Sequence, residues 1–159
     1  MTSSKHNSLI EVIEKEARLV GEFVAVLERE QAVLASGEID SLDALLAAKN
    51  DLAVQLEAVG AQRNSLLISQ GLTADPAGMQ AWCEQHQNTK ASSEFWPAIV
   101  AGAREAMRLN RLNGELIRLR LQYNERALEA LRRGDDSLNL YGPNGQSTAK
   151  SGVRLDDAV

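Results

Sequence analysis

Apolar residues recur at helical spacing along most of the chain, beginning with a segment from about residue 8 to residue 35. The residues that recur there every seven positions are Ile13, Val20, Leu27 and Leu34. Neighbouring apolar positions widen this stripe into the face of an amphipathic helix. Gly37 then provides a typical helix stop, and Asp40 or Ser41 can cap a following helix. The pattern therefore predicts an αα-hairpin.

The second segment, about residues 41–69, has the spacing of a coiled-coil seam, with intervals of three and four residues. The seam positions are Leu42, Leu45, Lys49, Leu52, Leu56, Val59, Arg63 and Leu66. Because a long aliphatic stem can cover a seam while its charge reaches water, we expect Lys49 and Arg63 to be solvated.

A short helix and a long one follow in the pattern. Asp75 before Pro76 is a cap followed by a proline at the first helical position, which predicts a helix over about residues 76–86. The polar stretch 88–93 is expected to be a mobile connection. Residues 95–133 then have the composition of one continuous helix, about 55 Å long at 1.5 Å per residue.

This last helix is apolar over more than one face. One stripe comprises Leu109, Leu112, Leu116, Leu119 and Tyr123, and a second comprises Ile99, Ala103, Ala106, Asn110, Asn113, Ile117 and Asn124. A helix packed against one hairpin needs a narrower apolar stripe than this. The surplus apolar surface either joins a three-helix core or meets a partner. Gly114 would let a neighbouring backbone approach closely. The asparagines either fix helix register or face water, and solvation is the default expectation.

Composition supports an all-α fold. The chain has 159 residues, of which 44% are hydrophobic and only 4% aromatic, and it contains three prolines. We predict an antiparallel bundle of long helices, in which a coiled-coil hairpin is joined by a short connecting helix to a long C-terminal helix. Residues 1–134 are expected to form a single helical domain and residues 135–159 a flexible tail.

Charge is unevenly distributed. The last helix carries eight arginines against four glutamates, a net charge of +4, which leaves −9 for the rest of a chain whose total is −5. A single-stranded nucleic-acid groove usually interleaves such arginines with aromatic residues, and this helix has one tyrosine beyond its first two residues. Neutralisation of the acidic hairpin explains the pattern more simply, so a nucleic-acid-binding module is a lesser alternative and no nucleic-acid partner is expected.

Residues that could perform chemistry are few. Cys83-x-x-His86 resembles half of a zinc site, but His6 is the only other histidine and the chain has no second cysteine. A core cysteine beside a solvent-facing histidine is the simpler interpretation. No nucleophile has a recognisable base near it, so we expect no enzyme, no metal and no cofactor. No apolar run approaches the roughly 20 residues of a membrane helix, and no signal core is present, so we expect a cytoplasmic protein without stable membrane insertion.

Three motifs together closely resemble the FlgN family of flagellar export chaperones. They are Asn110-x-x-Asn113-Gly114-x-Leu116-Ile117, then Ala127-Leu128-x-x-Leu131, and a tail segment Leu140-Tyr141-Gly142-Pro143-Asn144-Gly145-Gln146. The resemblance spans most of the chain. It implies a chaperone that holds the hook-filament junction proteins FlgK and FlgL and delivers them to the flagellar type III secretion apparatus, including its gate protein FlhA and the export ATPase complex.

The resemblance also implies where these partners bind. In the family the C-terminal part binds the client. Because the last helix has more apolar surface than one hairpin needs, we expect the client on Leu116, Leu119, Tyr123, Leu128, Leu131, Leu138 and Leu140. The tail is associated with docking at the export gate, and Tyr141 falls on the tail tyrosine, with Gly142 and Gly145 beside it. The main alternative is a structural coiled-coil adaptor without an export role, and a tail without any partner also stays open.

Overall fold

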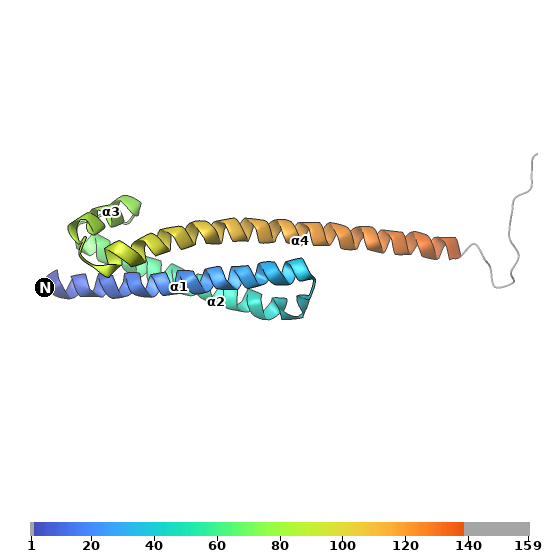
Figure 1. The fold of residues 1–159 in the computed structure, drawn as a ribbon, viewed down its shortest axis with the longest axis horizontal. Helices are drawn as coiled ribbons and strands as arrows, with labels where there is room; N and C mark the ends of the chain where they lie inside the picture. The colour runs from blue at the N-terminus through green and yellow to red at the C-terminus, as the bar shows by residue number, and fades with distance from the viewer. Residues whose placement is uncertain (1, 139–159) are drawn as a thin grey trace, which may run out of the picture. The chain divides into compact units, whose positions relative to one another are not determined.

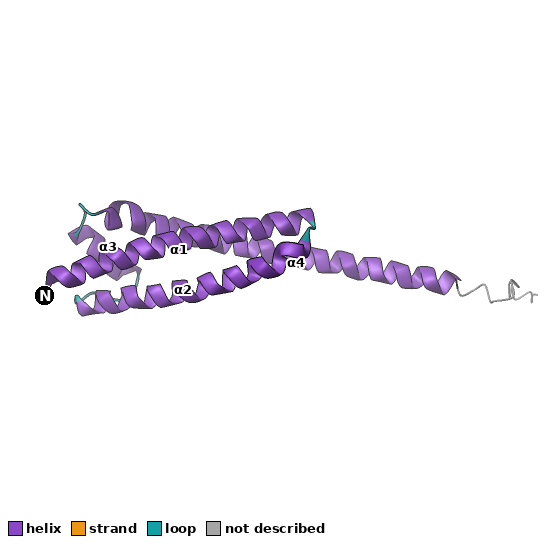
Figure 2. Ribbon diagram, turned by 90° about the horizontal axis from the view of Figure 1, so that it is seen from below, coloured by secondary structure: helices purple, strands orange, loops and turns teal. Residues whose placement is uncertain are grey.

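The fold is given by a computed structural model that describes residues 2–138, with side chains described for residues 8–134. Every regular element among these residues is helical (Figures 1 and 2). In chain order they are α1 (Thr2–Ser36), the 3-10 turn η1 (Ile39–Ser41), α2 (Leu42–Ser69), α3 (Pro76–Gln85), the π-helical turn η2 (Ala91–Phe95) and α4 (Trp96–Leu138). The predicted all-α architecture is confirmed.

The helix ends follow from local chemistry. Gly37 closes α1 with a φ of 85°, and Gly71 follows α2 with a φ of 79°, a backbone conformation that suits glycine. At the start of α3, the Asp75 carboxylate accepts a hydrogen bond from the Gly78 N–H at 2.8 Å. Pro76 occupies the first turn, where no N–H partner is needed.

The connection before α4 differs from the prediction. Residues 88–93 were expected to be a mobile link, but Ala91–Phe95 form a π-helical turn that leads directly into α4. Ala91 is fully buried, and the Thr89 carbonyl accepts hydrogen bonds from the amides of Ser92 and Ser93 at 3.1 Å each. Polar composition did not indicate this turn because its hydrogen bonds are made by short polar side chains and the backbone.

The chain divides into two compact units, residues 1–117 and residues 118–159. Helix α4 contributes its residues 96–117 to the first unit and its residues 118–138 to the second. Residues 139–159 are not described, so the expected tail lies mostly outside the described residues, and the expected single domain to residue 134 stays a prediction.

In the first unit, α1 lies against both α2 and α4 and is buried on two faces. One cluster joins Leu19 and Val26 to Leu52 and Val59 of α2. Another joins Leu27 to Ala106 and Leu109 of α4. A third cluster closes the α3 end around Trp82, and its buried members are Leu9, Ile13, Val20, Leu67, Met79, Trp82, Ala91 and Ile99. The wide apolar stripe of the first segment is explained by this double contact.

Two glycines of α4 have different surroundings. A Cβ added at Gly102 would lie 2.3 Å from Val20 Cγ1, so this glycine permits the close approach of α1 and α4. A Cβ added at Gly114 would meet no atom within 4 Å. The close approach of a neighbouring helix that was expected at Gly114 occurs instead at Gly102, about three turns earlier in α4.

Candidate protein-binding surface

The second unit carries large apolar side chains on its surface. From residue 121 to residue 134 every described residue is exposed. The large apolar residues of the second unit whose burial is described are Leu119 (55% exposed), Leu121 (58%), Tyr123 (74%), Leu128 (57%) and Leu131 (68%), and we call them the exposed apolar face. Single exposed leucines are ordinary, but five large apolar residues within thirteen positions mark a candidate interaction surface.

The exposed apolar face is wide. At 3.6 residues per turn, Leu119 and Leu128 point about 180° apart around the helix. Leu119 and Tyr123 therefore lie along one edge, Leu121 and Leu128 along the other, and Leu131 between them. Of the client residues expected from the sequence, Leu119, Tyr123, Leu128 and Leu131 therefore lie around about half of the helix and not along one stripe. Leu116, which belongs to the first unit, is half-buried.

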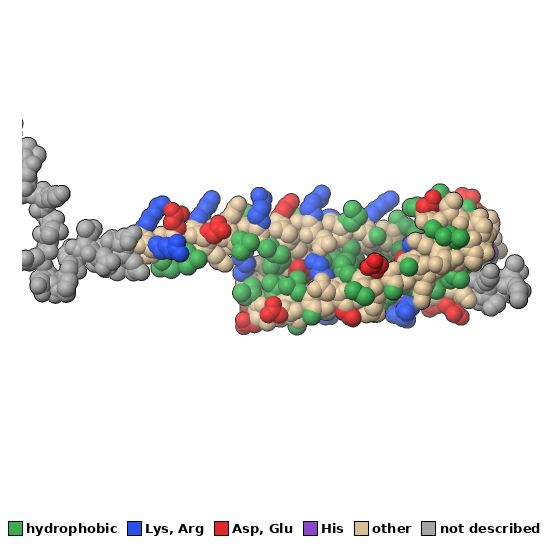
Figure 3. Space-filling view, turned by 180° about the vertical axis from the view of Figure 1, so that it is seen from behind, with side chains coloured by type: hydrophobic (Ala, Val, Ile, Leu, Met, Phe, Trp, Pro, Cys, Tyr) green, Lys and Arg blue, Asp and Glu red, His purple; other side chains and the backbone are tan. Residues whose placement is uncertain are grey.

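Charged residues occupy the opposite side of the same segment. Glu129 and Arg133 form an intrahelical ion pair there, with 2.6 Å between Arg133 Nη2 and Glu129 Oε1. Both side chains are mostly exposed, so this pair contributes little stability, about 0.3–0.5 kcal/mol. Figure 3 shows hydrophobic side chains along one edge of the end of α4 and charged side chains along the other. The segment is amphipathic without an intrachain cover among the described residues.

Two exposed apolar residues, one in each unit, lie outside the sequence-based set of client residues. Leu121 is 58% exposed, and Ile117, the last residue of the first unit, is 38% exposed. The signal that identifies them is a heptad pattern through positions 117, 121, 124, 128 and 131, with Asn124 as its polar member. The expected client residues came from the stripe through Leu116, Leu119 and Tyr123, and the second pattern was not extended beyond Asn124.

Several expected site residues lie outside the described side chains. Leu138 is the last residue of α4, and its side chain is not described. Leu140, Tyr141, Gly142 and Gly145 lie outside the described residues altogether. Their expected roles stay predictions.

A buried polar junction fixes α4 against the hairpin. Asn113, only 1% exposed, donates from Nδ2 to the Leu27 carbonyl at 3.0 Å and to Glu30 Oε2 at 3.1 Å. Lys49 Nζ of α2 lies 3.2 Å from the same carboxylate oxygen. Asn113 was expected to face water and Lys49 to be solvated, and both expectations are wrong. Asn110 and Asn124 are exposed.

A second polar junction lies nearer the α3 end. Arg63 Nη1 of α2 donates to Glu16 Oε1 of α1, and its guanidinium lies 5.4 Å from the centroid of the Trp96 ring. Burial raises the pKa of Glu16 above its ordinary value, and the charge and hydrogen bond of Arg63 oppose this rise. Arg63 therefore joins three helices instead of reaching freely into water, which corrects the sequence-based expectation.

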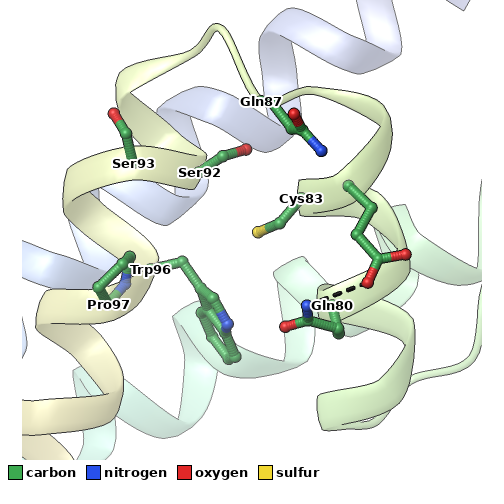
Figure 4. A pocket seen from close by; sticks show the side chains of 8 residues that line it. Gln80, Cys83, Gln87, Ser92, Ser93, Trp96 and Pro97 are labelled. Carbon is green, nitrogen blue, oxygen red and sulfur yellow. Dashed lines mark hydrogen bonds between the residues drawn. The ribbon is translucent and has the colours of Figure 1, made fainter.

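The first unit also contains a pocket beside Cys83 (Figure 4), with a volume of about 300 Å³. Its lining includes Gln80, Ser92 and Trp96, and the Cys83 thiol points into it. Burial raises the pKa of this thiol, which is the opposite of the lowered pKa that activates a nucleophilic cysteine. His86, expected to face solvent, is half-buried, with its ring stacked on Trp82 and Nδ1 2.8 Å from the Trp82 carbonyl oxygen.

Within residues 2–138 no three His, Cys, Asp or Glu side chains are grouped so that they could hold a metal ion. Among the described helices none has the length and apolar character needed to cross a membrane.

Comparisons with known proteins agree with one another. A family model described as "FlgN protein" matches residues 1–149. The chain is 27% identical over 143 residues to the "Flagella synthesis protein FlgN" of Salmonella typhimurium, covering 88% of this chain and 90% of that protein. It is 26% identical to the protein of the same name from Escherichia coli K12 with the same coverage. No solved structure matches the chain significantly.

Proposed function

Because the chain belongs to the FlgN family, we propose that it is a cytoplasmic export chaperone of flagellum assembly whose exposed apolar face binds a flagellar client protein. Its relatives are named flagella synthesis proteins, which supports a role in flagellum assembly. The clients we propose are hook-associated proteins of the FlgK and FlgL type, and the partners that receive the complex are the export gate FlhA and the export ATPase complex.

The single observation that carries this proposal is the uncovered apolar face of residues 118–134. More than half of the side-chain surface is exposed at Tyr123, Leu128 and Leu131. The same helix segment also carries many charged residues, but they do not replace these apolar ones at the surface. An amphipathic helix of a partner can cover such a face by laying its own apolar residues along it. The contact needs no nucleotide, so binding and release would depend on helix pairing alone.

The expected strength of this contact suits a transient complex. Coupled folding of a client segment costs about 2–5 kcal/mol of the gross interaction energy, so the net affinity is moderate. A surface formed by one helix also releases a client more readily than a closed cleft. Moderate affinity and ready release both suit a chaperone that transfers its client to an export apparatus.

Substitution of the face tests the proposal. Leu128→Asp with Leu131→Asp places two charges where the client must bury apolar groups, and we expect at least tenfold weaker client binding. A matched control is Gln122→Asp with Arg126→Gln, which changes the net charge equally on the opposite side of the helix. Co-purification with FlgK-like and FlgL-like proteins gives the result. If both variants retain the clients equally, the result would contradict the proposal and favour a coiled-coil adaptor.

A separate proposal concerns Tyr141, which we assign to docking at the export gate together with Gly142 and Gly145. The support is the resemblance of the tail segment to the family. Tyr141→Ala should leave client binding unchanged and lower client export several-fold, measured as FlgK-like protein in the culture medium. Tyr141→Phe is the matched control, because it keeps the ring. Loss of client binding by Tyr141→Ala would show the assignment to be wrong.

A further inference from the structure

A narrower heptad stripe with no described intrachain partner overlaps the exposed apolar face. Its members are Leu121, Asn124, Leu128 and Leu131, and all four are exposed. Alternating spacings of three and four residues bring them onto one line of an α-helix, as in a coiled coil. One polar residue in an otherwise apolar seam is typical of seams in which register is specified. We call these four residues the pairing seam.

We propose that the pairing seam binds the pairing seam of a second copy of this chain, in antiparallel orientation, about a two-fold axis between positions 129 and 130. In such an isologous contact residue i meets residue j and j meets i. Leu128 of one chain then meets Leu131 of its partner, and the reverse contact is formed at the same time.

Charge complementarity supports this register. Beside the seam, Glu125 of one chain lies opposite Arg132 of the other, so the pairing forms two identical ion pairs across the axis. Both residues are exposed, and neither forms an ion pair with another described residue of its own chain. The ion pair that this segment does form, Glu129 to Arg133, lies on the side away from the seam. The two charges beside the seam are thus available for a partner.

The other edge of the seam carries small residues. Ala127 of one chain lies opposite Gly134 of the other, which lets the two backbones approach closely. A Cβ added at Gly134 would meet no atom within 4 Å of its own chain. A glycine inside a helix costs about 1 kcal/mol relative to alanine. The close approach of a second helix would offset this cost.

Antiparallel pairing is favoured over parallel pairing by the rest of the chain. Residues 1–117 contain ten basic and sixteen acidic residues, a net charge of −6. Parallel pairing attaches both of these acidic units at the same end of the helix pair, where they repel and compete for space. It also places Ala127 opposite Arg132, which leaves the arginine without a carboxylate. Antiparallel pairing places the acidic units of the two copies at opposite ends of the helix pair. It also gives both Glu125 and Arg132 an opposite charge across the axis.

The inference does not depend on the proposed client, because the chain alone is measured. Pairing through so few apolar layers is weak, so the dimer should form at high concentration and be displaced by any partner that covers Leu128 and Leu131. A client that binds the exposed apolar face would therefore compete with the second copy.

Charge reversal on the full chain tests the pairing. Sedimentation velocity over a concentration series should give a mass that rises from 17.3 kDa toward twice that value. Glu125→Arg and Arg132→Glu should each weaken dimerisation roughly tenfold, because each replaces two attractive pairs by two repulsive ones. The double variant should recover wild-type dimerisation. A monomer at every concentration, or a double variant that is weaker than both single variants, would overturn the proposal.

Cross-linking tests the orientation independently of the charges. In a Cys83→Ser background, chains with Leu128→Cys are mixed with chains with Leu131→Cys and oxidised with diamide. Antiparallel pairing predicts that the disulfide between the two different chains dominates, because positions 128 and 131 face each other. A dominance of disulfides between identical chains would show a parallel pair and contradict the proposal. Circular dichroism of each variant confirms that its helix content is unchanged.

Discussion

At the scale of single residues, two buried acids are the most informative feature of the first unit. Glu30 is 1% exposed and Glu16 is 6% exposed, and each lies on α1 facing a basic residue of α2. Buried ion pairs contribute little net stability, because desolvation offsets most of the attraction, but breaking one partner is costly. These pairs therefore favour one helix register over its alternatives, since a shifted register would leave the charges unpaired.

Burial of Glu16 predicts that the unfolding free energy depends on pH. Its pKa is raised in the folded protein, mainly by burial, so its contribution to stability is present below its ordinary value of 4.5 and is lost as pH rises through the raised value. The Glu16→Gln variant does not lose stability in this way, because glutamine does not ionise. We expect the unfolding free energy of the wild type, relative to this variant, to fall as pH rises from about 4.5 toward neutrality.

Urea unfolding at several pH values measures the difference, with the exposed residue Glu14, changed to Gln, as the control. If the unfolding free energy of the wild type rises relative to that of Glu16→Gln as pH rises, attraction to Arg63 outweighs the effect of burial on Glu16.

The sequence identified these polar positions but not their partners. Lys49 and Arg63 were recognised as basic members of an apolar seam, which is correct, and were expected to be solvated, which is wrong. Their partners lie 19 and 47 residues away in the sequence. Asn113 contacts residues 83 and 86 positions away. Periodicity describes one helix at a time, so it cannot show which acid of a neighbouring helix lies opposite a given base.

At the scale of elements, α1 organises the first unit because it contacts both α2 and α4. Its contact with α4 is closest at Gly102, where an added Cβ would approach Val20 Cγ1 to 2.3 Å. Val20 is β-branched and has little freedom to turn away. Helix docking at this point therefore depends on the absence of a side chain at residue 102.

A matched pair of glycine substitutions measures this dependence. Gly102→Ala should destabilise the protein by about 1–3 kcal/mol through overpacking. Gly114→Ala, at a position with open space, should stabilise it by up to about 1 kcal/mol. Chemical denaturation gives both values. Adding Val20→Ala to Gly102→Ala should cost less than the sum of the single changes, and additive costs would show that the two residues do not constrain each other.

The helices were predictable from apolar spacing and capping residues, because these signals are local. The sequence predicted α2 over 41–69 and α4 from about residue 95, close to the observed Leu42–Ser69 and Trp96–Leu138. The turn Ala91–Phe95 was missed, because a π-helical turn has no periodic signature. The central position of α1 was also missed, because a stripe that contacts two helices resembles one wide stripe.

At the scale of the whole molecule, the surplus apolar surface of α4 is distributed unequally between the two units. In the first unit Ala106, Leu109 and Asn113 are buried against α1. In the second unit every residue from 121 to 134 is exposed, including four large apolar side chains. The sequence left open whether this surplus joins the core or meets a partner. The large apolar side chains of the second unit whose burial is described are exposed, so a partner is the physical expectation.

Hydrogen exchange tests the central claim, client binding by the exposed apolar face, most directly. The chain is measured alone and in complex with a FlgK-like client from the same genome, and amide exchange is followed by mass spectrometry. We predict slower exchange in peptides that cover residues 118–134, and no slowing there when the Leu128→Asp, Leu131→Asp variant is mixed with the client. Protection confined to residues 1–117, with unchanged exchange in 118–134, would contradict the account.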